Sequence, residues 1–164
     1  MFGEIRKKGE EVVVSRLDIS PTDGLDLDER FALEHFLGKN QEEAAALLSL
    51  DFSYYMEDLA HMGEKAFLYY LGAVRLYLER GEEKFAPSDY VEVAHTLLYV
   101  FQGRTESSPS WLQNANDDVS WIVSFIVSRL QKIIQDDESW VVDDMLISDK
   151  KIRSIIRRWC RFSV

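Results

Sequence analysis

The hydrophobic residues from position 28 onward recur with the spacing of α-helices. Apolar side chains at intervals of three and four residues lie on one face of a helix, whereas strands alternate at every second residue. Residues 64–80 are apolar on nearly every face, which is typical of a helix in the middle of a fold. We therefore predict an all-α, single-domain bundle of six to eight helices, with 64–80 and 117–136 at its centre. The spacing predicts helices over residues 28–38, 40–48, 54–62, 64–80, 87–102, 117–136 and 148–159.

Individual polar residues and glycines predict where these helices begin and where they contact each other. Asn40 and Glu43 have the spacing of a capping box, in which each side chain bonds to the backbone N–H of the other residue. Gly72 lies inside the central helix, where glycine costs about 1 kcal/mol relative to alanine. It is therefore predicted to allow a close helix crossing. Residues 140–147 fit either a strand or a short helix, because Trp-Val-Val favours a strand and the length suits a helix.

Residues 1–24 do not share the helical spacing. Val12 to Val14 favour a strand, and Leu17 and Ile19 alternate with charged residues. No second strand that could pair with this segment is evident, and an unpaired strand leaves its backbone groups without partners. We therefore predict an extended N-terminal arm over 1–24, docked on the body or swapped onto a neighbour, and a helical domain over 25–164.

The composition is that of an acidic globular protein. The chain has 164 residues, a net charge of −10 and 46% hydrophobic residues, which excludes disorder over most of its length. The single cysteine, Cys160, permits no internal disulfide. The first residues lack the apolar run of a signal peptide, and no uncharged stretch approaches the roughly 20 residues that span a bilayer. We expect a cytoplasmic protein with no integral membrane segment and, because phosphates would be repelled, no nucleic-acid partner.

Charge is concentrated at the C-terminus. Residues 149–164 carry +5, so the remaining residues carry −15. The last helix has one apolar stripe and a basic remainder, and such a helix can dock in a partner groove or on an anionic membrane. Its candidate partner-binding residues are Arg153, Arg157 and Arg158. The alternative, which we favour, is that the apolar stripe packs against the same protein and the basic face lies near the acidic body.

Two carboxylate–histidine pairs are the clearest candidate for chemistry. Asp58 and His61 have the spacing D-x-x-H, and Glu92 and His95 have the spacing E-x-x-H. Residues i and i+3 share a helix face, so each pair could hold one metal ion, as in di-iron helical bundles. The third histidine, His35, is expected to be structural. The two further glutamates of such a bundle are not both evident, so ordinary surface or core histidines are the favoured interpretation.

Residues 104–116 are predicted to form a long polar loop that contains Trp111. A loop of this length is typically functional or disordered. An exposed tryptophan there would be a binding anchor. Equally, Trp111 could fold back and cover the core.

One segment resembles a known group of proteins. The run Asp-Leu-Ala-His-Met-Gly-Glu-Lys-Ala-Phe-Leu-Tyr-Tyr-Leu-Gly-Ala begins at Asp58. It resembles a motif of small uncharacterised bacterial helical proteins, which carry an acid-Leu pair followed by an Ala-Phe-x-Tyr-Tyr-Leu-Pro-Ala-like helix. Gly72 stands where that motif has proline. The resemblance covers about 20 residues, and it implies a bacterial source and a helical fold but no activity.

These features favour a binding role over catalysis. No complete catalytic set is present, the chain is small, and its charge suits a basic protein partner. We expect a non-enzymatic, acidic protein-binding module without a cofactor, such as a toxin-neutralising (immunity) protein, and the sequence leaves homo-oligomer formation open. The alternative is a metal-binding helical-bundle enzyme that uses Asp58, His61, Glu92 and His95.

Overall fold

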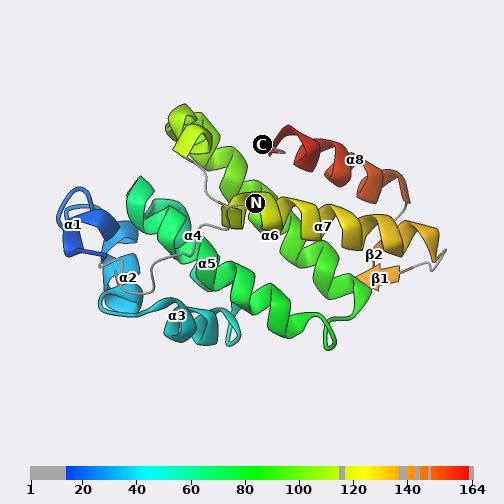
Figure 1. Cartoon of the computed structure of the whole chain (residues 1–164), viewed down its shortest axis with the longest axis horizontal. Helices are drawn as coiled ribbons and strands as arrows, with labels where there is room; N and C mark the ends of the chain where they lie inside the picture. Colours follow the sequence, from blue (N-terminus) through cyan, green and yellow to red (C-terminus); the bar gives the residue numbers. More distant parts are fainter. Residues whose placement is uncertain (1–13, 115–116, 137–139, 143–144, 148, 163–164) are drawn as a thin grey trace, which may run out of the picture.

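The computed structural model describes residues 14–114, 117–136, 140–142, 145–147 and 149–162. It confirms the all-α class (Figure 1). A short antiparallel pair of strands is added to the helices, with Trp140 opposite Ile147. The elements are α1 (Arg16–Ile19), α2 (Leu27–Phe36), α3 (Gln41–Leu48), α4 (Phe52–His61), α5 (Glu64–Gly81), α6 (Pro87–Ser107), the 3₁₀ helix η1 (Pro109–Asn114), α7 (Asp117–Gln135), β1 (Trp140–Val142), β2 (Met145–Ile147), α8 (Asp149–Trp159) and the 3₁₀ helix η2 (Cys160–Phe162).

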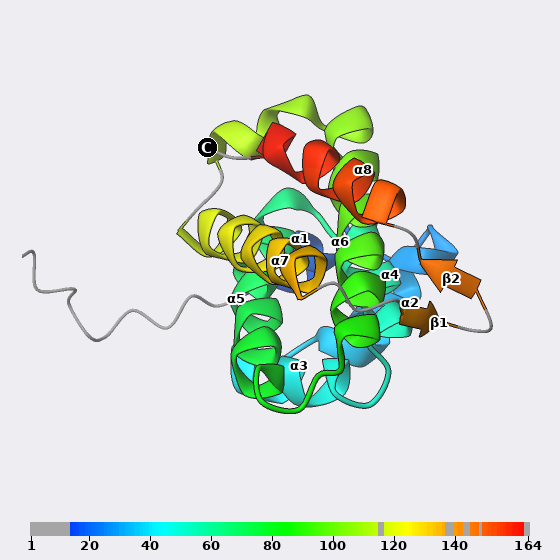
Figure 2. The same cartoon turned by 90° about the vertical axis from the view of Figure 1, so that its right-hand side faces the viewer.

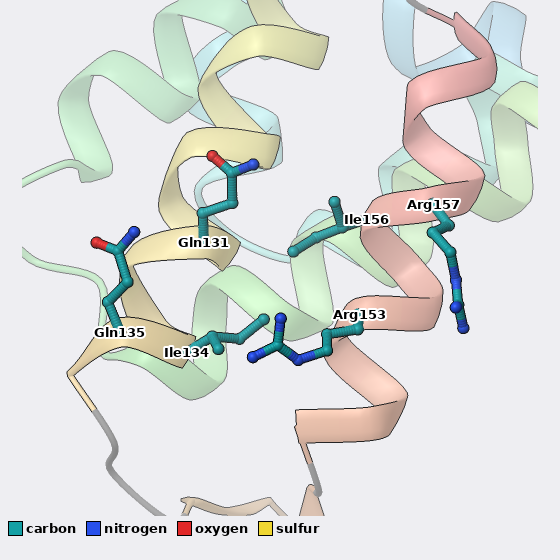
Figure 3. A pocket seen from close by; sticks show the side chains of 6 residues that line it. All are labelled: Gln131, Ile134, Gln135, Arg153, Ile156 and Arg157. Carbon is teal, nitrogen blue, oxygen red and sulfur yellow. The ribbon is translucent and has the colours of Figure 1, made fainter.

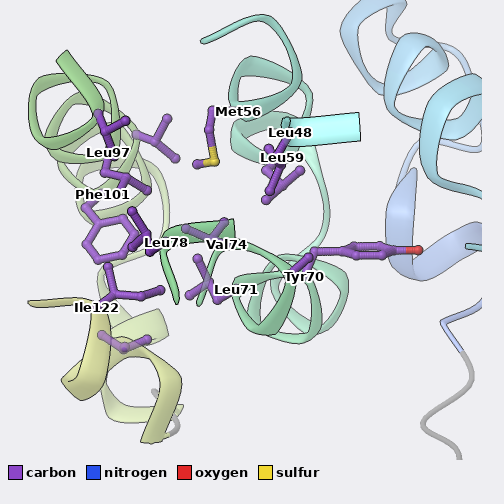
Figure 4. Packing of buried hydrophobic residues seen from close by; sticks show 14 of the residues in the cluster. Leu48, Met56, Leu59, Tyr70, Leu71, Val74, Leu78, Leu97, Phe101 and Ile122 are labelled. Atoms are coloured by element: carbon purple, nitrogen blue, oxygen red, sulfur yellow. The ribbon is translucent and has the colours of Figure 1, made fainter. Parts of the chain in front are cut away.

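Helix α5 lies at the centre of the bundle. It contacts α1, α3, α4 and α7, and α6 packs against α4, α7 and α8 (Figures 1 and 2). Side chains from α3 to α7 meet in one hydrophobic core (Figure 4). Tyr70, Leu71, Val74 and Leu78 of α5 are fully buried there, which confirms the central position predicted for residues 64–80. Among the described residues, no helix is both long and apolar enough to cross a membrane.

Gly72 allows α3 to approach α5 closely. The side chain of Gln41, at the start of α3, donates a hydrogen bond to the carbonyl of Tyr69 at 2.7 Å. A Cβ atom at Gly72 would lie 2.2 Å from the Nε2 atom of Gln41. The prediction of a close crossing at this glycine is therefore confirmed, and its partner is the capped end of α3.

The prediction of an extended arm is wrong for residues 14–24, and residues 1–13 lie outside the described part of the chain. Ser15 and Asp18 form a capping box around the single turn of α1. Ile19 is fully buried, while Leu17 is exposed. A hydrophobic alternation of only two residues fits one turn of a capped helix as well as it fits a strand, and the local capping bonds favour the helix.

Helix α1 is held against the start of α5. The backbone N–H of Gly63 donates to the carbonyl of Ile19 at 3.3 Å, and Lys65 Nζ donates to Asp18 Oδ2 at 2.8 Å. The bond from Lys65, together with those from Ser15, lowers the pKa of Asp18 to about 2. A Cβ atom at Gly63 would lie 2.5 Å from the carbonyl oxygen of Asp18, so this contact requires glycine.

The predicted loop over 104–116 is largely helical in its described part, residues 104–114. Helix α6 continues to Ser107, and η1 follows at once. Thr105 and Ser107 each donate a side-chain hydrogen bond to a carbonyl four residues earlier, at 2.8 and 3.0 Å. Polar side chains that bond to their own helix in this way are compatible with helical backbone, so polarity alone did not identify the end of the helix.

We expect Gly63→Ala to destabilise the protein, because the new methyl group would meet backbone atoms of α1 that cannot move aside without undocking it. Thermal unfolding followed by circular dichroism measures the change. Gly103→Ala is the matched control: it lies within α6, and no atom lies within 4 Å of the position that its new Cβ would take. That substitution should stabilise the helix by about 0.5–1 kcal/mol. Equal effects of the two substitutions would contradict the proposed contact.

Candidate binding surface

Helices α2 and α4 pack side by side in opposite directions, and a histidine–carboxylate pair joins them. His35 Nδ1 of α2 lies 2.7 Å from Asp58 Oδ2 of α4. Asp58 is 7% exposed. A carboxylate at this depth is costly unless it is paired, and His35 is the partner that makes its burial tolerable. His35, which we expected to be structural, is thus the hydrogen-bonding partner of Asp58, which we predicted to be a metal ligand.

Burial changes the protonation of Asp58. The loss of solvent raises the pKa of its carboxyl group above the ordinary value of 3.8, although the hydrogen bond and charge of His35 act in the opposite direction. The folded state therefore holds a proton on Asp58 more tightly than the unfolded state does. Ionisation of this group weakens the fold as the pH rises.

A cage of aromatic rings surrounds His35. The ring centroids of Tyr55 and Tyr54 lie 5.3 and 5.6 Å from that of His35, and Phe31 stacks on it at 6.4 Å. Tyr55 also packs edge-on against the buried Phe36. These contacts fix the orientation of the imidazole, because aromatic pairs prefer the edge-to-face and stacked geometries observed here.

A second, looser pair lies at the other end of the same helix contact. His61 Nε2 of α4 is 3.7 Å from Asp28 Oδ2 of α2, and both side chains are substantially exposed. An exposed pair at this distance contributes little to stability. It does show that the two helices face each other along residues 28–35 and 54–61.

The outer side of this contact is an acidic and aromatic surface. Phe31 is 43% exposed and Tyr54 is 48% exposed. The pKa of Tyr54 is raised, first by partial loss of solvent and then by the negative charges of Asp58, Glu34 and Asp51. Of these carboxylates, Asp51 is the N-cap of α4, and its Oδ1 accepts a hydrogen bond from the backbone N–H of Tyr54 at 3.0 Å. We call Phe31, Glu34, Asp51 and Tyr54 the acidic aromatic patch.

The structure does not assemble the predicted metal site. Asp58 turns to His35, while His61 faces Asp28. Glu92 and His95 are exposed on α6. Within the described residues, which include all four predicted ligands, no three His, Cys, Asp or Glu side chains come together as a metal site would require. The i, i+3 spacing places two side chains on one helix face but does not fix which neighbour that face meets.

Trp111 covers the core and is not an exposed anchor. It is fully buried, and its ring packs edge-on against Phe101 and Phe67 at 5.1 and 5.4 Å. Its Nε1–H donates to Thr105 Oγ1 at 3.0 Å. The second of the two interpretations of Trp111 is therefore confirmed, and the partner-binding role suggested for this residue is wrong.

The last helix also packs against its own protein. Ile155 and Trp159 of α8 are buried, and Trp159 Nε1–H donates to the carbonyl of Ala94 at 3.2 Å. Arg158 donates to Gln102 Oε1 of α6. Arg153 and Arg157 remain exposed. Of the three candidate arginines, two are therefore available to a partner and one is engaged within the fold.

Sequence reasoning missed the importance of Phe31, His35 and Tyr54. A usable signal was present, because Asp28, Phe31 and His35 are spaced i, i+3, i+7 and so share one face of their helix. Nothing in the sequence states that this face meets α4. Comparison of the chain with protein-family models, curated proteins and solved structures finds no match. The resemblance to small bacterial helical proteins stays a prediction.

We expect Asp58→Asn to change how stability depends on pH. Asp58 has a raised pKa in the folded state, so its contribution is most favourable below pH 4 and is lost as the pH rises through that raised value. The free energy of unfolding of the wild type relative to the variant should therefore fall between pH 4 and pH 7. Urea titrations at several pH values measure it.

Asp28→Asn serves as the control for this experiment. Asp28 also faces a histidine, but it is exposed, so its removal should change stability by less than about 0.5 kcal/mol at any of these pH values. Curves for wild type and Asp58→Asn that stay parallel from pH 4 to pH 7 would show that Asp58 is not the group responsible.

Proposed function

We propose that the protein is a non-enzymatic binding module whose acidic aromatic patch docks a basic segment of another protein. The observation that supports this most directly is the exposure of Phe31 and Tyr54, at 43% and 48%, next to carboxylates. Exposed aromatic rings at the centre of a surface are typical energetic anchors of interfaces. Carboxylates beside them select a cationic partner.

The chemistry of the patch suits an arginine or lysine side chain. A guanidinium or ammonium group can lie over the Tyr54 ring through a cation–π interaction, worth about 0.5–2 kcal/mol. Glu34 and Asp51 can accept charge-assisted hydrogen bonds from the same cation. Arginine suits this arrangement best, because its planar group both stacks on rings and bonds to carboxylates in a bidentate manner.

The patch is preorganised by the layer beneath it. His35 and Asp58 hold α2 and α4 together, and Tyr54 and Tyr55 pack on the imidazole and on each other. A partner therefore does not have to order these side chains as it binds. Binding surfaces that are rigid before association lose less entropy when the complex forms.

The net charge of the chain also favours a basic protein partner. A net charge of −10 attracts a basic protein over distances longer than direct contact. Such steering accelerates association and weakens steeply with salt. Fast capture of a basic protein is what a toxin-neutralising (immunity) protein requires, and this is the function class that we propose for the chain.

We expect a phage-displayed peptide library panned on the folded protein to yield peptides rich in arginine. Tyr54→Ser should weaken their binding by about tenfold, which corresponds to the loss of an interface anchor. Titration calorimetry measures the affinity, and circular dichroism confirms that the variant is folded. Tyr99→Ser is the matched control, because Tyr99 is 74% exposed on α6, outside the patch.

A pair of charge-reversal variants tests how much the acidic residues accelerate association. Glu34→Lys should slow association of the selected peptides, whereas Glu83→Lys, an equal charge reversal at an exposed position in the turn after α5, should slow it much less. Stopped-flow measurements at several NaCl concentrations report the association rate. Selected peptides without basic residues, or rates that do not change with salt, would refute the proposed mode of binding.

A further inference from the structure

A groove of about 570 Å³ lies between α7 and α8 (Figure 3), helices that are separate from α2 and α4 (Figure 1). It is lined by Gln131, Ile134 and Gln135 from α7 and by Arg153, Ile156 and Arg157 from α8. Arginines from one helix and amides from the other thus border two isoleucines. The groove combines an apolar floor with groups that attract and bond an anion.

The wall formed by α8 is fixed in place. Ile155 and Trp159 are buried in the core, and Trp159 and Arg158 both donate hydrogen bonds to α6. These contacts hold α8 against α6. The groove therefore exists without a ligand, as small-molecule sites usually do.

One arginine, Arg153, and two isoleucines, Ile134 and Ile156, face the space between the two helices (Figure 3). Arg153 extends from α8 toward Ile134 of α7, and Ile156 points into the same space (Figure 3). Gln131 and Gln135 stand one helical turn apart on the facing helix. Arg157 stands one turn after Arg153 on α8 and points away from α7 in this view. Arg153 is therefore the cation nearest the floor, and Arg157 adds positive charge at the rim.

Arg153 and Arg157 are both exposed to solvent. In the acidic body, arginines pair with carboxylates, as Arg75 does with Asp118 and Arg80 with Glu42. Among the side chains that the structure describes, none forms an ion pair with Arg153 or Arg157. An anion placed between the two helices would lie near the exposed guanidinium of Arg153.

The size of the groove favours a small molecule over a protein partner. Stable protein interfaces use about 20 residues on each side, whereas six residues line this groove. Its volume lies within the range of small-molecule sites, about 300–1,000 Å³. We propose that the α7–α8 groove binds an anionic amphiphile, a carboxylate or phosphate head group on an aliphatic chain. Arg153 bonds the head group, and Ile134 and Ile156 contact the chain.

Octanoate and monooctyl phosphate are suitable probes, because both combine an anionic head with a short aliphatic chain. We expect one or both to bind the full chain in titration calorimetry and to shift the backbone amide NMR signals of α7 and α8. Acetate, which lacks the chain, and octanol, which lacks the charge, should bind at least about tenfold more weakly. The stronger of the two octyl ligands identifies the head group.

Arg153→Gln should weaken binding of the octyl ligand by about tenfold, since a hydrogen bond to a charged group is lost. Arg161→Gln is the matched control: it makes the same change of charge at an exposed residue just beyond α8, outside the groove. Both arginines are exposed, so both variants should fold, and thermal unfolding verifies this.

Three results would overturn the proposal. The first is that neither octyl ligand binds, and the second is that the NMR shifts fall outside α7 and α8. The third is that the two arginine variants weaken binding equally. Equal losses together with binding to phosphatidylglycerol vesicles would show a general attraction of the basic helix to anionic membranes. The peptide experiments on the acidic aromatic patch are independent of these measurements, so either proposal can fail without the other.

Discussion

A cluster of aromatic rings joins the central helices to the C-terminal segment. Phe101 of α6 is at its centre and meets Trp111, Trp159 and Phe162 at centroid distances of 5.1, 5.3 and 5.5 Å, while Phe67 of α5 packs on Trp111. Through these contacts the central helices bind η1 and the C-terminal segment. Large buried rings contribute much of the stability of a small core, so the position of α8 depends on this cluster.

The cluster also decides which surfaces are left for partners. It removes Trp111 and two residues of the apolar stripe of α8, Ile155 and Trp159, from the surface, although both features suggest docking in the sequence. The surfaces that stay exposed include the acidic aromatic patch on α2 and α4 and the groove between α7 and α8. These lie in different parts of the bundle (Figure 1), and their opposite charges suit different ligands. The uneven charge of the chain is thus reflected in two separate surfaces.

Most helices were predictable because the information that forms them is local. The capping box at Asn40 and Glu43 is present as expected, and helical spacing placed residues 64–80 and 117–136 correctly to within a few positions. Gly72 also predicted a contact between helices, because a glycine in an apolar helix needs a compensating close approach. The helical turn from Ser15 to Ile19 was not predicted, since a segment of a few residues has too few positions to distinguish helical from strand spacing.

The sequence by itself determined the helical class, the central position of residues 64–80 and the separation of charge between body and C-terminus. These follow from composition and from side-chain spacing within single helices. Only the tertiary structure decided that Asp58 pairs with His35 and that Arg153 faces α7. The physical reason is that periodicity fixes which residues share a helix face, whereas the packing of the whole core decides which face of another helix they meet.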